Sequence, residues 1–229
     1  MLYKKLFYFD IETVGQYSNL EQLKKNDVIG YNLFLKKYKN NSWMVDKYGS
    51  VENAYLGDSP ISTTFGKIVC ISFGYYHSKN IQGYTISSIC EHDERELIKK
   101  FVDLINKVSN KGMLLSGYMI KSFDIPWVVH KITKYGLEFP RLLDVYGKKQ
   151  WDILAFDLAD EWKQGGRYYI PFDEVAYELG VESPKDKMDG SKVHKTYWDE
   201  DDLNSIRVYC EKDVEACLRI SEKMLKYKL

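Results

Sequence analysis

The stretch "LFYFDIET", residues 6 to 13, decides the fold of this chain. Its run of aromatic and aliphatic residues predicts a strand buried on both faces, as in the centre of a mixed or parallel sheet. Asp10 and Glu12 are two residues apart, so they project from the same side of the strand, about 6.6 Å apart along the chain. Two carboxylates this close repel each other unless a cation or a proton lies between them, and Mg²⁺ or Mn²⁺ prefers oxygen ligands. Taken alone, the pair fits a solvated strand end better than a metal site.

Composition limits the classes of protein to consider. The chain has 229 residues, of which 45% are hydrophobic, which is enough for one sizeable core, so we expect a single domain over residues 1–229. Its 33 basic residues balance 33 acidic ones. No global field therefore attracts nucleic acid or an anionic membrane, and any binding of a polyanion must come from local patches.

The cysteines and histidines give no metal or disulfide signal. The four cysteines include no CxxC pair, and the four histidines lack zinc-ligand spacing, so we expect neither a disulfide framework nor a zinc site. A reducing environment fits best, and no apolar stretch is long enough to span a membrane. These features predict a soluble, cytoplasmic protein with no membrane partner.

The order of predicted elements indicates an α/β fold. Strands are expected at residues 4–12, 67–76 and 81–87, the last two joined by the turn "HSKN", and in "GMLLSGYM", residues 112–119. Helical spacing of apolar residues follows an acidic first turn in residues 93–109. Further helices are expected from about Asp124 to a cap at Gly136, and around residues 153–162, 172–179 and 201–225.

Two stretches fall outside this order. Residues 15–66 form a long connection between the first two strands, and "YNLFLKKYK" within it indicates a helical insertion after the first strand. Residues 181–198 are polar and lysine-bearing, which predicts a loop over one end of the sheet.

Two further groups of polar residues accompany Asp10 and Glu12. Asp124 stands at a predicted strand-to-helix junction, where the carboxyl ends of α/β strands gather ligands, although an ordinary helix N-cap would look the same. In "YCEKD", Tyr209 and Asp213 are four residues apart and share one face of the last helix.

Together, "FDIET", "GYMIKSFDIP" and "YCEKD" stand in the order and rough spacing of the three motifs of the DEDD 3′-to-5′ exonucleases, in the YxxxD (DEDDy) subtype. The chain resembles most the stand-alone relatives of the proofreading exonuclease domain of B-family DNA polymerases. "FGKIVCISFGYY" and "DLNSIRVYCEKDVEACLRI" are also similar to that group. The resemblance implies a ribonuclease-H-like fold, in which a five-stranded mixed sheet is flanked by helices.

The resemblance also implies the site. Asp10, Glu12, Asp124 and Asp213 match the four metal-binding acids, which would hold two divalent ions, Mg²⁺ or Mn²⁺, about 4 Å apart. Tyr209 matches the tyrosine that helps to position the attacking water. The expected products are 5′-mononucleotides released from the 3′ end of single-stranded DNA.

One residue departs from the family pattern, and the expected substrate contacts are less specific. Many relatives carry asparagine where Met119 stands in "GYM", and methionine has no amide for hydrogen bonding, which puts nucleotide positioning by this residue in doubt. Contacts to substrate are expected from Thr13, Phe123, Ser191 and Lys192. Core packing of Phe123 and a solvated loop at 185–195 are equally open alternatives.

Three other features have competing interpretations. Lys36, Lys37 and Lys39 could extend a binding groove, but the neighbouring aromatic residues fit docking of the insertion better. Asp152 matches a family aspartate that could support the site. His194 lies outside the third motif, where Tyr209 occupies the subtype position.

Three functions remain open from the sequence. The first is a metal-dependent exonuclease on single-stranded DNA, with a separate polymerase or repair protein as a possible partner. The second is an RNA 3′-to-5′ exonuclease that uses the same site, because contacts to the 2′-hydroxyl alone distinguish the polymers. The third is a non-catalytic nucleic-acid or polymerase-partner module, which has little reason to confine four like charges.

Overall fold

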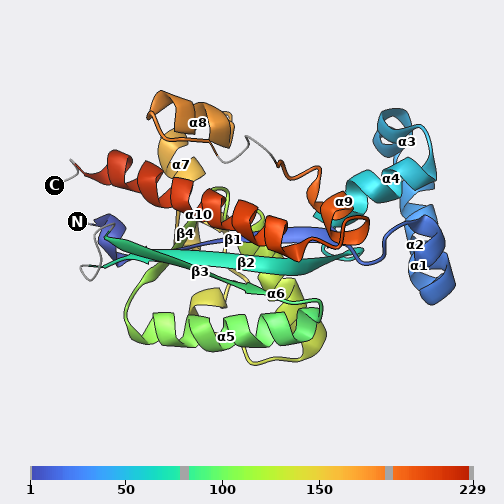
Figure 1. The fold of residues 1–229 in the computed structure, drawn as a ribbon, viewed down its shortest axis with the longest axis horizontal. Helices are drawn as coiled ribbons and strands as arrows, with labels where there is room; N and C mark the ends of the chain where they lie inside the picture. Colours follow the sequence, from blue (N-terminus) through green and yellow to red (C-terminus); the bar gives the residue numbers. More distant parts are fainter. Residues whose placement is uncertain (1, 78–82, 184–187, 227–229) are drawn as a thin grey trace.

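The chain folds around one five-stranded mixed sheet with helices on both faces (Figure 1). The computed structural model describes residues 2–77, 83–183 and 188–226. The strand order is β3-β2-β1-β4-β5, in which β2 is antiparallel to β1 and β3, and β4 is parallel to β1 and β5. The predicted α/β class and mixed sheet are therefore confirmed. The strands are β1 (Leu6–Gly15), β2 (Gly66–Tyr76), β3 (Tyr84–Cys90), β4 (Leu114–Gly117) and β5 (Ala155–Asp157).

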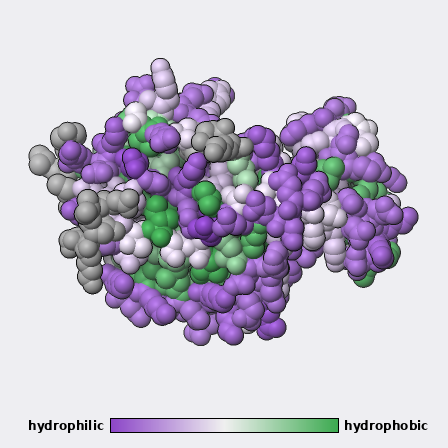
Figure 2. All heavy atoms as spheres, viewed as in Figure 1, coloured by the Kyte–Doolittle hydropathy of each residue, from purple (hydrophilic) through white to green (hydrophobic). Residues whose placement is uncertain are grey.

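Long helices cover the two faces of the sheet. Helix α10 (Leu203–Leu225) runs along one face and α5 (Glu94–Asn110) along the other, with α6 (Asp124–Tyr135) packed beside α5 (Figure 1). The short helices α7 (Leu158–Lys163) and α8 (Phe172–Glu178) lie on the α10 side. Space-filling atoms on this view are mostly hydrophilic, and hydrophobic residues gather over the sheet between α10 and α5 (Figure 2).

Alternation along β1 decides which face receives each side chain. Phe7, Phe9 and Ile11 belong to the core that packs under α5 and α6. Leu6 and Tyr8 belong to the core on the α10 side. Because side chains alternate in a strand, Asp10 and Glu12 also face α10.

The predicted helical insertion after the first strand is present and forms a lobe beyond one end of the sheet (Figure 1). It has its own small core, in which the buried Phe34 ring meets Tyr55 and Phe65 edge-on at 5.2 and 5.0 Å between centroids. Tyr31 and Tyr38 pack against the same core. The aromatic residues thus hold the insertion together. Its helices are α1 (Leu20–Asn26), α2 (Val28–Lys39), α3 (Ser42–Tyr48) and α4 (Val51–Asp58).

Two predicted segments differ from the structure. The helix expected at residues 153–162 is strand β5 followed by α7, because Ala155–Asp157 pair with the end of β4 and Asp157 then caps the helix. The loop expected at 181–198 contains helix α9 (Val193–Trp198), which packs against β1. Residues 184–187 of this predicted loop, and residues 78–80 of the predicted "HSKN" turn, lie outside the described residues.

The expectation of no disulfide was wrong. Cys70 of β2 and Cys90 of β3 are directly opposite in the antiparallel register and form a disulfide. Twenty residues separate them in sequence, and only strand pairing brings them together, so cysteine spacing gave no sign of the bond. Cys210 and Cys217 are free and buried.

Short 3-10 helices complete the described chain, at Leu2–Lys5, Ser59–Ile61, Arg141–Leu143 and Gln150–Asp152. Within residues 2–77, 83–183 and 188–226, no helix has the length and apolar character that crossing a bilayer requires.

Candidate active site

The site begins where β1 extends past its parallel neighbour. Strand β4 pairs with β1 only as far as Tyr8, opposite Ser116, and β4 ends at Gly117. A Cβ at Gly117 would lie 2.8 Å from the Phe9 carbonyl oxygen, so glycine allows the chain to leave the sheet this close to β1. Beyond this point the β4-facing edge of β1, which carries Asp10 and Glu12, is open to other groups.

Asp124 fills part of that open edge. It is the first residue of α6, and its Oδ1 accepts a hydrogen bond of 3.1 Å from the backbone N–H of Ile11. The N-cap position belongs to Phe123, whose side chain makes no capping bond. The carboxylate is therefore turned toward β1, which it meets at Ile11, the residue between Asp10 and Glu12.

Helix α10 supplies the remaining predicted residues. The side chains of Tyr209 and Asp213 share a hydrogen bond, as their four-residue spacing allows. The Asp213 charge acts on both Glu12 and Asp124, and Asp10 acts on Glu12. Four carboxylates from three elements therefore lie close enough to act on one another, with the Tyr209 hydroxyl bonded to Asp213.

The environment of these acids opposes their ionisation. Glu12 and Asp124 are only 7% and 3% exposed. Burial raises the pKa of Asp10 and Glu12 well above the usual range, and their acidic neighbours raise it further. Burial, with Asp157 and Asp213 nearby, raises the pKa of Asp124 to about 8. No lysine, arginine or histidine of the described chain forms an ion pair with Asp10, Glu12 or Asp124.

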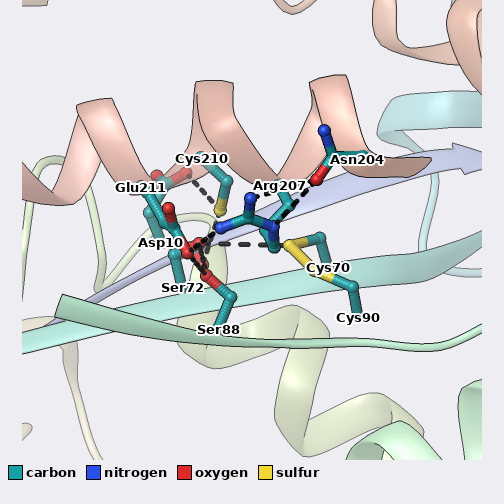
Figure 3. Close-up of a disulfide and its surroundings, with 9 residues drawn as sticks. All are labelled: Asp10, Cys70, Ser72, Ser88, Cys90, Asn204, Arg207, Cys210 and Glu211. Atoms are coloured by element: carbon teal, nitrogen blue, oxygen red, sulfur yellow. Dashed lines mark hydrogen bonds and ion pairs between the residues drawn. A yellow bond between two sulfur atoms is a disulfide. The ribbon is translucent and has the colours of Figure 1, made fainter. Parts of the chain in front are cut away.

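Sequence reasoning overlooked Cys210, which projects from α10 toward Asp10 (Figure 3). Its Sγ donates to the main-chain oxygen of Asp10 at 3.4 Å and to Asp10 Oδ2 at 3.5 Å. Ligand atoms of Asp10, Glu12 and Cys210 all lie within 4.8 Å of one another. Burial raises the pKa of the Cys210 thiol well above its usual range, so the thiol is a hydrogen-bond donor to Asp10. The sequence signal that could have identified Cys210 is its position next to Tyr209, on the face of α10 that packs against the sheet.

A chain of polar groups continues from this point across the sheet (Figure 3). Ser72 Oγ of β2 lies 2.9 Å from Ser88 Oγ of β3, and Ser88 donates to Glu211 at 2.7 Å. Arg207 donates a hydrogen bond to the same Glu211 oxygen at 2.7 Å. These bonds tie α10 to β2 and β3, and so fix the helix position that brings Tyr209 and Asp213 toward β1.

Asp157, at the end of β5, was also overlooked as part of the site. One of its carboxylate oxygens accepts from the N–H groups of Met119 and Ala159, and the other from that of Lys121, all at 3.0 Å. It is buried and holds the turn that leads into Asp124. Asp152, which we considered as a possible support for the site, is exposed in a 3-10 helix, and Asp157 is the acid that holds the turn. We predicted a helix at residues 153–162, so the sequence did not indicate that Asp157 lies at the end of a strand.

Met119 occupies an unusual backbone conformation in the same turn. Its φ is 56°, in the left-handed region that asparagine adopts more readily than most side chains, and its side chain is 37% exposed. Its carbonyl accepts from the N–H groups of Ser122 and Phe123, both at 3.0 Å. The position thus favours asparagine for a backbone reason, in addition to any contact of its amide.

The expected substrate contacts have other partners in the structure. The Thr13 hydroxyl donates to the Pro60 carbonyl at 2.6 Å, and Phe123 packs at 5.9 Å from the Trp127 ring. Ser191 and Lys192 are exposed and both bind Asp189. Their role in substrate binding stays a prediction.

His194 has a structural partner on each side of its ring. Its Nδ1 accepts from the Gly15 N–H at 3.0 Å, and its Nε2 donates to the Ser18 carbonyl at 3.0 Å. Burial lowers its pKa. The imidazole therefore joins α9 to the end of β1, and both nitrogens are occupied, which leaves none for a general base.

The family was identified by comparison with known proteins. Residues 60–219, more than half of the chain, match the model of a family described as "Predicted 3'-5' exonuclease related to the exonuclease domain of PolB". The chain belongs to this family. The matched residues of this exonuclease family include Asp124, Tyr209 and Asp213, whereas Asp10 and Glu12 precede them and join the site through the fold.

The fold of this family member is similar to that of a solved DNA polymerase. The family B DNA polymerase from the hyperthermophilic archaeon Pyrobaculum calidifontis matches with a TM-score of 0.52 and 17% identity over 96% of this chain. This chain spans only 24% of that polymerase. The likeness confirms the ribonuclease-H-like fold that the motifs predicted. Comparison with curated proteins gave no significant match.

Proposed function

We propose that this protein is a metal-dependent 3′-to-5′ exonuclease that releases 5′-mononucleotides from single-stranded DNA. The observation that carries the proposal is the convergence of Asp10, Glu12, Asp124 and Asp213 at the open edge of β1, with the Tyr209 hydroxyl on Asp213. Membership of the exonuclease family supports the reaction class.

The donor set fits hard divalent cations. All four side chains offer carboxylate oxygens, the ligands that Mg²⁺ and Mn²⁺ prefer. Three of them have raised pKa values because of burial and mutual repulsion, and within the described chain no cationic side chain pairs with Asp10, Glu12 or Asp124. Confined like charges of this kind are characteristic of functional sites. When bound, two such ions supply Lewis-acid activation of a water and stabilisation of the leaving oxygen.

The chain's own residues have separate tasks in this proposal. Asp10 and Glu12 would hold the cations from the central strand, and Asp124 and Asp213 would complete the site from opposite faces of the sheet. Tyr209 bonds Asp213 through its hydroxyl, whose lone pairs can still accept from a water and orient it for attack on the terminal phosphodiester. Cys210 positions Asp10 through its hydrogen bond to that carboxylate. Asp157 positions the turn before Asp124.

One gel experiment tests the proposal. Purified protein is incubated with 5′-labelled single-stranded DNA, duplex DNA or RNA, each with Mg²⁺, Mn²⁺ or EDTA. The expected result is stepwise shortening of single-stranded DNA from the 3′ end with either metal and none in EDTA. Preference for the RNA strand would favour the RNA exonuclease that the same site allows.

The variant Asp10→Ala should abolish this shortening. Asp103→Ala is the matched control, because it removes an exposed aspartate from α5 on the other side of the sheet, and it should retain full activity. Cleavage that persists in EDTA or in Asp10→Ala would overturn the proposal, as would cutting that starts inside the strand.

A further inference from the structure

Two large aromatic side chains are exposed in neighbouring segments, the 3-10 helix Gln150–Asp152 after α6 and the loop after α7. Trp151 is 74% exposed and Tyr168 is 70% exposed. Large rings in water are costly, and in a group they mark a binding surface more often than single exposed residues do. We call Trp151, Tyr168 and the two cations beside them, Lys149 and Arg167, the aromatic platform.

A cation accompanies each ring of the platform. Lys149 Nζ lies 5.1 Å from the centre of the Trp151 ring, and the guanidinium carbon of Arg167 lies 5.3 Å from that of Tyr168. Neither cation forms an ion pair with an acid in the described part of the chain. The platform therefore presents flat apolar faces together with two positive charges that form no ion pair in the described part of the chain.

The platform is connected to the turn that carries Asp124. Gln150, next to Trp151, hydrogen-bonds Tyr169, next to Tyr168, so the two loops meet. Tyr169 donates to Asp160 at 2.7 Å, and Asp160 pairs with Lys121 at 3.9 Å.

A second connection runs from the Tyr168 loop. The Tyr118 hydroxyl donates to the carbonyl of Ile170. Tyr118 and Lys121 lie on either side of Met119, in the turn that Asp157 holds beside Asp124. The platform is thus built onto the same structural unit as one of the four site carboxylates.

We propose that this platform binds the single-stranded polynucleotide upstream of the scissile 3′ end. Every base has a π-face, so Trp151 and Tyr168 can stack on unpaired bases without reading sequence, and Lys149 and Arg167 can contact the adjoining phosphates. The inference rests on the proposed function, since it assigns a path to the strand that the four carboxylates would cut. An aromatic, cationic surface suits this polyanion better than it suits a protein partner of mixed charge.

Binding and chemistry can be measured separately. Binding is followed by fluorescence anisotropy of 5′-fluorescein-labelled oligothymidylate in EDTA, where no cleavage is expected. Chemistry is followed with thymidine 5′-(p-nitrophenyl phosphate) and Mn²⁺, a substrate with one nucleotide and no upstream strand for the platform to bind. Failure of the wild-type protein to hydrolyse this ester would count against the proposed function and would leave the binding result standing.

The substitutions Trp151→Ala and Tyr168→Ala should each weaken oligothymidylate binding by about 5- to 150-fold, the range for loss of one stacked base. Both should leave hydrolysis of the nitrophenyl ester unchanged. Trp151→Phe should recover most of the affinity because it restores a stacking face. Trp43→Ala is the matched control, since it removes another exposed indole with a lysine over the ring, from helix α3, and should bind as the wild type does.

Substitution of the two cations of the platform should change the salt dependence of binding. Lys149→Ala and Arg167→Ala should each reduce the slope of log affinity against log salt by about 0.7, the value for one contact to a single-stranded phosphate. Wild-type affinity in both ring variants would overturn the platform, as would an equal loss in Trp43→Ala. Loss of nitrophenyl ester hydrolysis in the properly folded ring variants would also overturn it, because the rings would then belong to the catalytic centre.

Discussion

The backbone N–H of Ile11 donates a hydrogen bond of 3.1 Å to the carboxylate of Asp124, which joins the start of α6 to the strand between Asp10 and Glu12. This bond places a third acid at a site where two already repel each other. Asp124 therefore has two tasks: its carboxylate accepts the hydrogen bond from Ile11, and it adds negative charge to the site.

The two tasks can be tested with two substitutions. Asp124→Asn keeps an oxygen for Ile11 and removes the charge, so we expect a folded protein whose nuclease activity is lower by at least about 100-fold. Asp124→Ala also leaves the Ile11 N–H unpaired, which should lower the free energy of unfolding by about 1–3 kcal/mol relative to Asp124→Asn. Urea denaturation and the gel assay measure the two effects. Full activity in Asp124→Asn would show that the charge is dispensable.

Asp157 should matter for both stability and activity, although it would touch neither metal nor substrate. Asp157→Ala removes the acceptor for three backbone N–H groups, and we expect the free energy of unfolding to fall by about 2–3 kcal/mol. Turnover should fall because the turn before Asp124 loses its support. Asp157→Asn retains one acceptor oxygen. Its free energy of unfolding and its turnover should therefore lie between those of the wild type and those of Asp157→Ala. The exposed Asp152 provides the control, and Asp152→Ala should change neither quantity.

The left-handed backbone of Met119 predicts a stabilising substitution. Met119→Gly should raise the free energy of unfolding by about 1 kcal/mol, because glycine adopts a φ of 56° without the cost that a Cβ imposes. Met119→Asn should give a smaller gain, and Met119→Ala none, since alanine keeps the Cβ. Urea denaturation of the three variants checks this order. A gain for alanine equal to that for glycine would mean that the exposed methionine side chain, and not the backbone, is responsible.

The raised carboxyl pKa values predict how pH affects the metal-free protein. The pKa of Asp124 rises from 3.8 to about 8, so between these values the folded protein binds more protons than the unfolded chain does. Stability in EDTA should therefore fall as pH rises from about 4 to about 8. His194, whose pKa is lowered, contributes with the opposite sign below pH 6.5.

Addition of Mg²⁺ isolates the contribution of the carboxylates from that of His194. Metal ligands must be ionised, and a bound cation removes their repulsion, so Mg²⁺ should raise the melting temperature more at pH 8 than at pH 5. Melting curves in EDTA and in Mg²⁺ across this range make the comparison. An equal increase at both pH values would contradict the assignment of these acids as the ligands.

The strong periodic signals in the sequence predicted most of the fold. The apolar run before Asp10 predicted β1, helical spacing predicted α5 and α10, and the proline after Asp124 with the cap at Gly136 predicted α6. Strand β5 was not predicted, because three residues give no period and depend on pairing with β4. Asp157 was overlooked for the same reason, since its role depends on where β5 ends.

The candidate site shows the same division between local and tertiary information. Spacing within motifs placed Asp10 with Glu12 and Tyr209 with Asp213, because each pair lies on one strand or one helix face. The Cys70–Cys90 disulfide and the bond from Cys210 to Asp10 depend on strand register and helix docking, which local sequence does not encode. The exposure of Trp151 and Tyr168 likewise became visible only with the fold.

The most direct test of the central claim is anomalous diffraction from crystals soaked in Mn²⁺ at the concentration that supports cleavage. We expect anomalous peaks between the carboxylates of Asp10, Glu12, Asp124 and Asp213, and their loss in crystals of Asp10→Ala. Absence of any peak among these four side chains in the wild-type protein, under conditions in which it degrades DNA, would contradict the account.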